Sequence, residues 1–242
     1  MSSSRKAVIE EAARGELLDW DSTFFGIKIA RLHSLEGALL WCAENAVVCA
    51  YFLADADDSD AIALAEAQGF HLRDVRMTLK RTCLPAGEIV PYPLVRGFRE
   101  SDMPAMVSIA RRSHQESRFY QDSHFSRVRC DELYETWIRR SCLGWANAVL
   151  VAEIGQEPIG YLTCHLSAEG RGSIGLFAVD EAWRGKGAGR QLVDASLDYF
   201  RQSRASSIEV ITQGRNIRSQ RLYQRCGFLP TSLQFWYHLW TP

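Results

Sequence analysis

Apolar residues fall into short continuous runs and into helically spaced stretches, which together predict a mixed α/β protein. Residues 47–53 form a continuous apolar run rich in β-branched and aromatic residues, the pattern of a buried strand. Residues 57–60 then supply an acidic helix N-terminus, and Gly69 ends that helix. The expected elements of this first part are strand 24–32, helix 35–45, strand 47–53, helix 57–67 and strand 71–79.

The longer part of the chain begins at Leu94 and ends in alternating strands and helices. Ser101 is the expected N-cap of its first helix, while the polar and aromatic stretch 114–125 has no clear period. The expected elements are strand 94–98, helix 101–112, helix 130–142, strands 148–153, 159–165 and 173–179, helix 187–203, strand 207–212, helix 218–226 and a strand pair within 228–240.

Three prolines and a glycine in residues 81–93 mark this segment as a linker, because proline fixes φ and interrupts strand ladders. The predicted organisation is therefore a polar leader (1–16), a small domain (17–80), the linker and a larger domain (94–242). Both domains contain a helix followed by Gly-Phe and a strand, at Gly69-Phe70 and at Gly227-Phe228. Either chance or an internal repeat explains this, and in the second case the first domain is a truncated copy of the other.

Composition narrows the classes of function. With a formal net charge of -1 the chain has no global basic field, which argues against a nucleic-acid partner. No apolar run approaches the roughly 20 residues of a membrane span, and the N-terminus lacks the apolar core of a signal peptide. The seven cysteines show neither CxxC pairs nor metal spacing, and the six histidines show no ligand spacing. We therefore expect a cytoplasmic protein with reduced thiols, no metal and no membrane partner.

A glycine-rich turn carries the clearest chemical signal. Residues 184–189, Arg-Gly-Lys-Gly-Ala-Gly, follow the apolar strand 174–179 and open a helix. Glycines let backbone amides approach an anion, and the start of a helix adds unsatisfied N–H groups and a positive dipole end. Arg184, Lys186 and Arg190 add side-chain charge, so the segment suits a pyrophosphate.

Two other phosphate-binding motifs do not fit this turn. A GxGxxG motif would need glycine at 192, where Leu192 stands, and a P-loop would need Ser or Thr where Gly187 follows Lys186. The turn instead resembles the R/Q-x-x-G-x-G/A motif of the GNAT acetyltransferases, which Arg184, Gly187 and Gly189 match. The order of elements from Leu94 onward is also similar to that of a GNAT domain.

The resemblance implies a GNAT fold: a mixed, mostly antiparallel central sheet flanked by helices, here with a smaller, truncated GNAT-like N-terminal unit. It also implies acetyl-CoA as the acyl donor, with its pyrophosphate on the turn and its pantetheine arm along the preceding strand. Tyr223 is then the general acid for the departing CoA thiolate, since a phenol with a pKa near ~10 matches that task; a packing tyrosine is the alternative. The implied cofactor-binding residues are Phe177, Ala178, Val179, Arg184, Gly185, Lys186, Gly187, Ala188, Gly189, Arg190, Asn216 and Tyr223.

A second resemblance concerns the acceptor. Residues 20–26, Trp-Asp-Ser-Thr-Phe-Phe-Gly, resemble the W-[DE]-x-x-[FY]-F-G opening of the bacterial TDP-fucosamine acetyltransferases, and residues 117–119 resemble their S-R-F motif. This implies a small-molecule acceptor, the amine of a nucleotide-linked amino-dideoxy sugar. The stretch has cations that could bind a diphosphate and aromatic side chains that could stack on the base and the sugar, which is compatible with such an acceptor. The alternative interpretation is that it is only a polar surface loop. The implied substrate-binding residues are Ser117, Arg118, Phe119 and Tyr120.

Attack on a thioester needs a neutral amine, so a base must take a proton. Asp74 aligns with an acidic residue assigned as base in those enzymes; a surface salt bridge with Arg73 or Arg76 is the alternative, and Glu116 and Asp122 are weaker candidates. A homodimer is also implied, although residues 234–240 suit core packing as well as a dimer edge. Two other functions stay open: acetylation of a protein N-terminus, peptide or small amine, and a non-catalytic acyl-CoA sensor.

Overall fold

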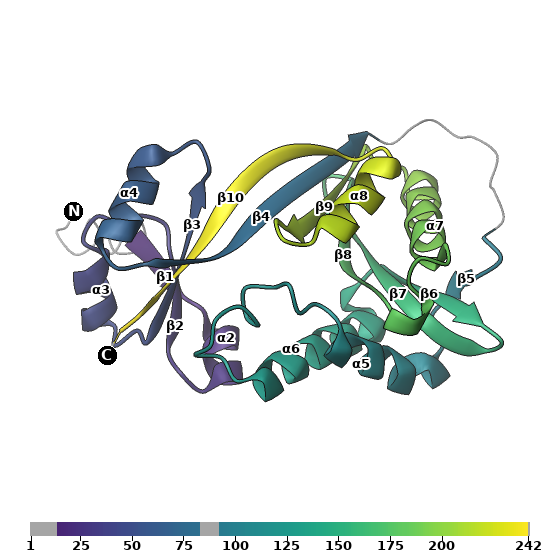
Figure 1. Ribbon diagram of the computed structural model, residues 1–242, viewed down its shortest axis with the longest axis horizontal. Helices are drawn as coiled ribbons and strands as arrows, with labels where there is room; N and C mark the ends of the chain where they lie inside the picture. Colours follow the sequence, from purple (N-terminus) through teal and green to yellow (C-terminus); the bar gives the residue numbers. More distant parts are fainter. Residues whose placement is uncertain (1–13, 83–91, 242) are drawn as a thin grey trace. The chain divides into compact units, whose positions relative to one another are not determined.

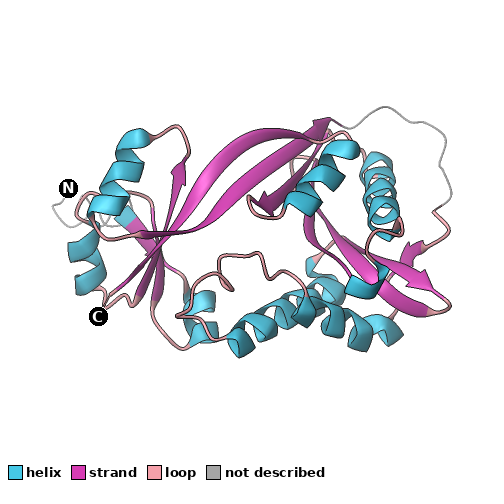
Figure 2. Ribbon diagram, viewed as in Figure 1, coloured by secondary structure: helices cyan, strands magenta, loops and turns pink. Residues whose placement is uncertain are grey.

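The computed structural model describes residues 14–82 and 92–241, in which ten strands and seven α-helices are found (Figures 1 and 2). The chain forms two compact units, and the division falls within the long strands β4 and β10. The first unit comprises residues 1–76 and 233–242, and the second comprises residues 77–232. None of the described helices is both long and apolar enough to cross a membrane.

The first unit is a small sheet covered by helices. Strands β1, β2, β3 and the end of β10 lie in that order, with β2 and β3 parallel and the other pairs antiparallel. Side chains of α3 and α4 pack with these strands in one apolar core that includes Trp41, Phe52 and Tyr237. The elements are β1 (Gly15–Leu17), α2 (Asp19–Phe25), β2 (Ile29–Leu32), α3 (Ala38–Glu44), β3 (Cys49–Asp55), α4 (Ser59–Ala67), β4 (His71–Thr82) and β10 (Leu229–Trp240).

The second unit has strand order β4-β9-β8-β7-β6-β5, and the pair β8–β9 is parallel whereas β5 to β8 are antiparallel. In Figure 1, α7 lies on one face of β6, β7 and β8 and α5 with α6 lies on the other. The elements are β5 (Val95–Gly97), α5 (Met103–Arg112), α6 (Arg127–Arg140), β6 (Ala148–Ile154), β7 (Glu157–Leu166), β8 (Arg171–Val179), α7 (Ala188–Gln202), β9 (Ser207–Gln213) and α8 (Ile217–Arg225).

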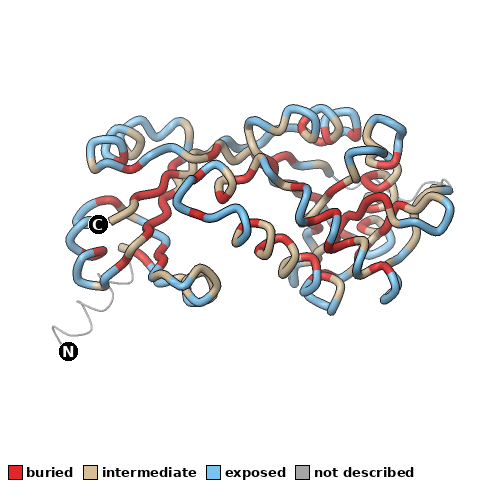
Figure 3. Tube along the Cα trace, turned by 60° about the horizontal axis from the view of Figure 1, so that its bottom comes forward, coloured by how far each residue is buried: buried red, intermediate tan, exposed pale blue. Residues whose placement is uncertain are grey.

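The core of the second unit explains why α7 is fixed on its strands. Leu192, Val193 and Phe200 of α7 are fully buried against Ile174 of β8 and Ile208 of β9. Burying such side chains contributes roughly 1.5–3 kcal/mol each. Buried stretches follow the strands and the inward faces of the helices (Figure 3). The start of α7, where the glycine-rich turn lies, is therefore held at a fixed place beside β8.

The predicted mixed, mostly antiparallel sheet flanked by helices is confirmed, but several local predictions were wrong. Residues 24–25 end a helix rather than begin a strand, because Trp20 and Phe24 stack at helical spacing with ring centroids 5.1 Å apart. Residues 15–17, partly assigned to the leader, form β1. Ser101 lies in a short 3-10 turn (Glu100–Asp102), and α5 has no side-chain cap.

The C-terminal strand pair expected within residues 228–240 is one strand, β10. Its last part pairs with β3, from Gln234 with Asp55 to Trp240 with Cys49. Residues 233–242 therefore join the first unit, whereas the sequence assigned them to the larger domain. Residues 1–13 of the predicted leader and 83–91 of the predicted linker lie outside the described residues.

Both units contain the same order of elements: two parallel strands joined by a helix, then a second helix and a long strand. The second helix ends alike in each unit, since Gly69 and Gly227 have φ of 83° and 82°. The amide after each glycine also donates a hydrogen bond to an equivalent carbonyl in the helix. Phe70 donates to Ala65 and Phe228 donates to Tyr223, at 3.0 Å in both. A truncated internal copy has these features, and we retain that interpretation as a proposal.

Candidate active site

Strand β8 is the element around which the site is built. Its pairing with β7 runs from Gly172 to Val179, but its parallel pairing with β9 covers only residues 171–174. From Gly175 onward, β8 has no registered partner on the β9 side within the described residues. The two strands thus form a fork, and a strand edge of this kind can pair with another extended chain through backbone N–H and C=O groups. The predicted cofactor strand, residues 177–179, lies on this edge.

A β-bulge lies in β8 at the base of the fork. Between the pairs Cys164–Ile174 and Leu162–Phe177, β7 advances two residues while β8 advances three. The extra residue in β8 shifts the side chains that follow it to the other face and locally bends the strand. Phe177 therefore shares a face with Ile174, and its ring centroid lies 6.0 Å from that of Tyr223 on α8.

The glycine-rich turn joins β8 to α7 through a 3-10 turn (Glu181–Trp183). Gly185 and Gly187 have φ of 78° and 91°, a region that costs other residues roughly 1–2 kcal/mol. Gly187 is the N-cap of α7 and offers no side-chain cap to the first amides of that helix. A helix start with uncapped N–H groups and the positive dipole end is an anion site. The local geometry therefore fits the predicted pyrophosphate contact.

The first turn of α7 packs directly on β8. A Cβ at Gly189 would lie 3.2 Å from Cζ of Phe177, so glycine permits the close approach of helix and strand. Arg190, which was predicted to contact the cofactor, donates from Nε to Asp194 at 2.5 Å and from Nη1 to the carbonyl of Arg225 at 3.3 Å. Its charge is therefore partly neutralised within the protein.

The other two cations of the turn have different surroundings. Arg184 donates from Nε to the carbonyl of Val179 at 3.0 Å, which ties the turn back to the end of β8. Its guanidinium also lies 3.8 Å from the exposed carboxylate of Glu181. The ammonium of Lys186 lies 4.4 Å over the ring of Trp183, a cation–π arrangement. Arg184 thus shapes the turn, and Lys186 supplies an exposed charge.

Tyr223 and Asn216 are placed by α8. Tyr223 is 3% exposed, and burial raises the pKa of its phenol above the ordinary value, with Cys226 adding to the shift. The phenol therefore stays protonated at neutral pH and can act as a proton donor. Asn216 is the N-cap of α8, and its side-chain oxygen accepts from Ser219 N at 3.1 Å. This leaves the amide N–H groups of Asn216 as its possible contacts to a ligand.

The predicted acceptor loop is more buried than its sequence suggested. Ser117 and Phe119 are each 4% exposed, and Phe119 packs edge-on against Phe125 and Trp137. Phe119 is thus a packing residue in this structure, because its neighbours already cover its ring. The contact of Phe119 with a substrate stays a prediction.

The other members of that loop also have internal contacts. The guanidinium of Arg118 lies 4.2 Å over the ring of Phe119, and the hydroxyl of Tyr120 donates to Asp131 at 2.6 Å. Burial and this hydrogen bond raise the pKa of Tyr120. Arg118 retains a partly exposed side chain and is the member of the loop best able to meet a ligand.

Asp74, the predicted base, lies in the part of β4 that belongs to the first unit. It is 4% exposed, and its carboxylate accepts from the amide of Val75 at 2.9 Å. Asp74 is therefore a buried carboxylate rather than a surface one, and its assignment as the base stays a prediction. Among the described residues, no group of three or more His, Cys, Asp or Glu side chains is placed to hold a metal ion.

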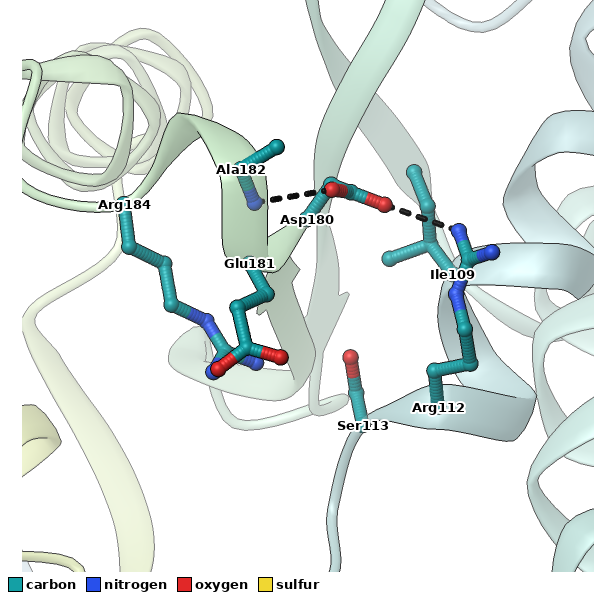
Figure 4. A pocket seen from close by; sticks show the side chains of 7 residues that line it. All are labelled: Ile109, Arg112, Ser113, Asp180, Glu181, Ala182 and Arg184. Carbon is teal, nitrogen blue, oxygen red and sulfur yellow. Dashed lines mark hydrogen bonds and ion pairs between the residues drawn. The ribbon is translucent and has the colours of Figure 1, made fainter.

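Two cavities open in the second unit. One, of about 410 Å³, lies beside the glycine-rich turn, where Arg112 and Asp180 form an ion pair at 2.8 Å (Figure 4). Arg184 and Ser113 reach the same space from opposite sides in this view. The other, of about 490 Å³, lies at the base of the fork and is lined by Trp145, His165, Ser173, Ile174, Gly175, Glu209 and Ile211. No local sequence pattern predicted the second cavity, because its walls come from four separated segments.

The fork, the bulged strand and the uncapped, glycine-rich helix start are the features of an acyltransferase that uses coenzyme A. The chain belongs to the acetyltransferase (GNAT) family, whose model matches residues 105–228. Enzymes of this family use acetyl-CoA as acyl donor, and this is the family that the turn predicted.

Two of the relatives that the chain resembles have names from saccharide metabolism. The chain is 32% identical over 139 residues to the spore coat polysaccharide biosynthesis protein SpsD of Bacillus subtilis (strain 168), covering 57% of this chain and 48% of that protein. It is 25% identical over 232 residues to the dTDP-fucosamine acetyltransferase of Escherichia coli O6:H1, covering 91% of this chain and 96% of that protein. The chain thus spans about half the length of the first relative and nearly all of the second.

A solved structure has the same fold. The GCN5-related N-acetyltransferase from Sphaerobacter thermophilus superposes with a TM-score of 0.64 at 16% identity, covering 93% of this chain and 76% of that one. At this identity the likeness concerns the fold alone. It confirms the GNAT architecture that the order of elements predicted.

Proposed function

We propose that the protein transfers an acetyl group from acetyl-CoA to the primary amine of a nucleotide-linked amino-dideoxy sugar, with dTDP as the nucleotide. The observation that carries the donor half is the fork between β8 and β9 ending at the uncapped start of α7. The near full-length similarity to a dTDP-fucosamine acetyltransferase supports the acceptor half.

The residues of the second unit suit the donor as follows. The amides at the start of α7, with Gly185 and Gly187 in left-handed conformations, would bind the pyrophosphate, and Lys186 would add charge. The β8 edge at residues 177–179 would hold the pantetheine arm through backbone hydrogen bonds. When bound, acetyl-CoA supplies an acetyl thioester at neutral pH.

Transfer proceeds by direct attack in a ternary complex. The amine nitrogen forms a bond with the acetyl carbon, the carbon–sulfur bond breaks, and Tyr223 protonates the departing thiolate. A phenol is protonated at neutral pH, so Tyr223 carries the proton that the thiolate would take. The resemblance names Asp74 as the acceptor of the amine proton, and comparing Asp74→Asn with wild type in kcat/KM and its pH profile tests that assignment.

The acceptor half rests on a loop whose accessible cation is Arg118. In the proposed complex its guanidinium would contact the diphosphate of the nucleotide sugar, since arginine binds such groups in a bidentate manner. Phe119 and Tyr120 would then act mainly by fixing the loop, because their side chains already have internal contacts, and Ser117 is buried beside them in the sequence.

An assay of CoA release against a panel of amines tests the proposed function. The panel contains dTDP- and UDP-linked amino-dideoxy sugars, the matching free amino sugars, and peptides. Turnover restricted to nucleotide-linked amines is the expected result. Turnover on peptides alone would replace this proposal with N-terminal or peptide acetylation, and acetyl-CoA binding without turnover on any amine would favour a sensor.

A further inference from the structure

The cavity at the base of the fork has a polar wall that the donor site does not use. It opens where the β8–β9 pairing ends, since Ile174 is the last paired residue of β8 and Gly175 is the next. Ile211 borders it from β9 and Trp145 from the π-helical turn after α6 (Ser141–Trp145). The cavity therefore reaches the bulge of β8, the place at which the two strands separate.

His165 of β7 lies directly against this bulge. A Cβ at Gly175 would lie 2.6 Å from Nε2 of His165 and 2.7 Å from Oγ1 of Thr163. Such distances are below van der Waals contact, so only glycine at 175 lets the imidazole lie so near the β8 backbone. The ring is half-buried, and it meets Trp145 edge-on with centroids 5.4 Å apart.

Thr163 connects the bulge to this histidine. Its side chain is fully buried, and Oγ1 accepts from the amide of Leu176 at 2.8 Å. The same oxygen lies 3.3 Å from Nε2 of His165. Because a hydroxyl both donates and accepts, it can donate to a neutral imidazole and accept from a protonated one. Thr163 can therefore serve both protonation states of His165 while it fixes the bulge.

The surroundings keep the imidazole neutral near pH 7. Burial lowers the pKa of His165, and a hydrogen bond with the backbone of Trp145 opposes that shift in part. The facing charged groups are Glu209 of β9, whose carboxylate lies 3.3 Å from the ammonium of Lys80, and Arg140, whose guanidinium lies 5.6 Å from the Trp145 ring centroid. Because Glu209 is paired, it does not impose a strong unbalanced negative charge on the ring.

We propose that the acceptor amine binds in this cavity and that His165, in place of Asp74, takes its proton, with Thr163 as the positioning residue. The inference rests on the acetyl transfer proposed above. As nitrogen bonds to the acetyl carbon it becomes a strongly acidic ammonium, and its proton moves to the ring nitrogen of His165 that does not face Thr163. The carbon–sulfur bond breaks, Tyr223 gives a proton to the sulfur, and the proton on His165 returns to the phenolate through solvent. The products are an amide and CoA thiol, with no net proton change.

Two measurements test the role of His165. The first is an NMR titration of the histidine ring signals of the unliganded protein, in which the signal missing from His165→Gln should titrate below the ordinary value near ~6.5. The second is the pH profile of kcat/KM for wild type, His165→Gln, Thr163→Ser and Thr163→Val. His33→Gln is a matched control, because His33 is an exposed residue near Glu16 in the first unit.

His165→Gln is expected to lower kcat/KM about 10²- to 10⁴-fold and to remove the acidic limb, while acetyl-CoA affinity measured by calorimetry stays at the wild-type value. Thr163→Ser should keep the wild-type pH profile of kcat/KM. Thr163→Val should shift the acidic limb of that profile and the midpoint of the His165 NMR titration by the same amount.

Two results would overturn the inference. One is a His165→Gln enzyme with the wild-type rate and limb, particularly if Asp74→Asn removes that limb instead. The other is a His165 signal that titrates at or above ~6.5. If the wild type binds acetyl-CoA but acetylates no amine, the proposed function fails and this inference fails with it. If the wild type acetylates an amine and His165→Gln does so at the same rate, only the inference is overturned.

Discussion

Gly189 packs on Phe177 so closely that a Cβ at position 189 would lie 3.2 Å from the tip of the phenylalanine ring. One residue lies in the first turn of α7 and the other on the open edge of β8. The contact therefore fixes the distance between the proposed pyrophosphate site and the proposed pantetheine strand. The third glycine of the turn matters for packing, whereas Gly185 and Gly187 matter for backbone conformation.

Gly189→Val should weaken acetyl-CoA binding, because its branched side chain displaces the start of α7 or the ring of Phe177. Calorimetric titration with acetyl-CoA measures this, and we expect at least a tenfold rise in Kd, which corresponds to about 1.4 kcal/mol. Gly170→Val is no suitable control, because Gly170 has a φ of 71°. Gly97→Val is suitable, since position 97 has open space and an ordinary φ. An unchanged Kd for Gly189→Val would contradict the packing argument.

Lys186→Ala should weaken acetyl-CoA binding about tenfold, the effect of one charge-assisted contact to phosphate. Binding of S-acetylpantetheine, which has no pyrophosphate, should not change. Lys28→Ala in the first unit is a matched loss of one lysine charge. Equal weakening of both ligands would show that Lys186 acts through the fold of the turn rather than through the phosphates.

Tyr223→Phe should lower kcat about 10²- to 10⁴-fold if the phenol is the general acid. The affinity for acetyl-CoA should stay the same, since the ring and its packing against Phe228 are retained. Tyr199→Phe on α7 controls for loss of a hydroxyl elsewhere in the second unit. Steady-state kinetics with the acceptor found in the panel measures the effect, and a wild-type kcat would assign Tyr223 a packing role only.

Asp102 should make stability depend on pH in the acidic range. Its carboxylate accepts two hydrogen bonds from Arg96, at 2.7 and 2.9 Å, and these lower its pKa most, with help from the amide of Arg99. A carboxyl whose pKa is lower in the folded state stabilises the protein above its unfolded pKa and loses this effect as pH falls through the folded value. Denaturant unfolding should therefore show stability decreasing below about pH 4.

The matched variant for that measurement is Asp102→Asn. This substitution should lower the free energy of unfolding by on the order of 3 kcal/mol at pH 7, because it leaves the largely buried Arg96 short of a partner. It should also reduce the slope of stability against pH below about pH 4. Arg96 also contacts Glu153, which retains part of the charge balance. A variant as stable as wild type with the same pH slope would contradict this account.

Local sequence signals predicted the proposed donor site but not the cavity proposed for the acceptor. The turn at 184–189 could be predicted because its strand, glycines, cations and helix are consecutive in the chain. In contrast, His165 meets Gly175 only through the register of β7 on β8 and the bulge in β8. The register between two strands is set by tertiary packing, so no residue pattern along either strand predicts this contact.

The remaining misassignments have physical causes of the same kind. Phe24 and Phe25 read as the start of a strand, but the stacking of Phe24 on Trp20 favours a helix. The stretch around Phe119 has no clear period, but Phe125 and Trp137 bury its ring. In each case a contact between side chains outweighed intrinsic preference, which is weak for aromatic residues.

The most direct test of the account is a single-turnover experiment with protein, acetyl-CoA and the dTDP-linked amino-dideoxy sugar, followed by mass spectrometry. The account predicts one N-acetylated nucleotide sugar for each CoA thiol released, and protein that carries no acetyl group at any time. CoA release without acetylated sugar, or a stable acetyl group on one of the cysteines, would contradict direct transfer in a ternary complex.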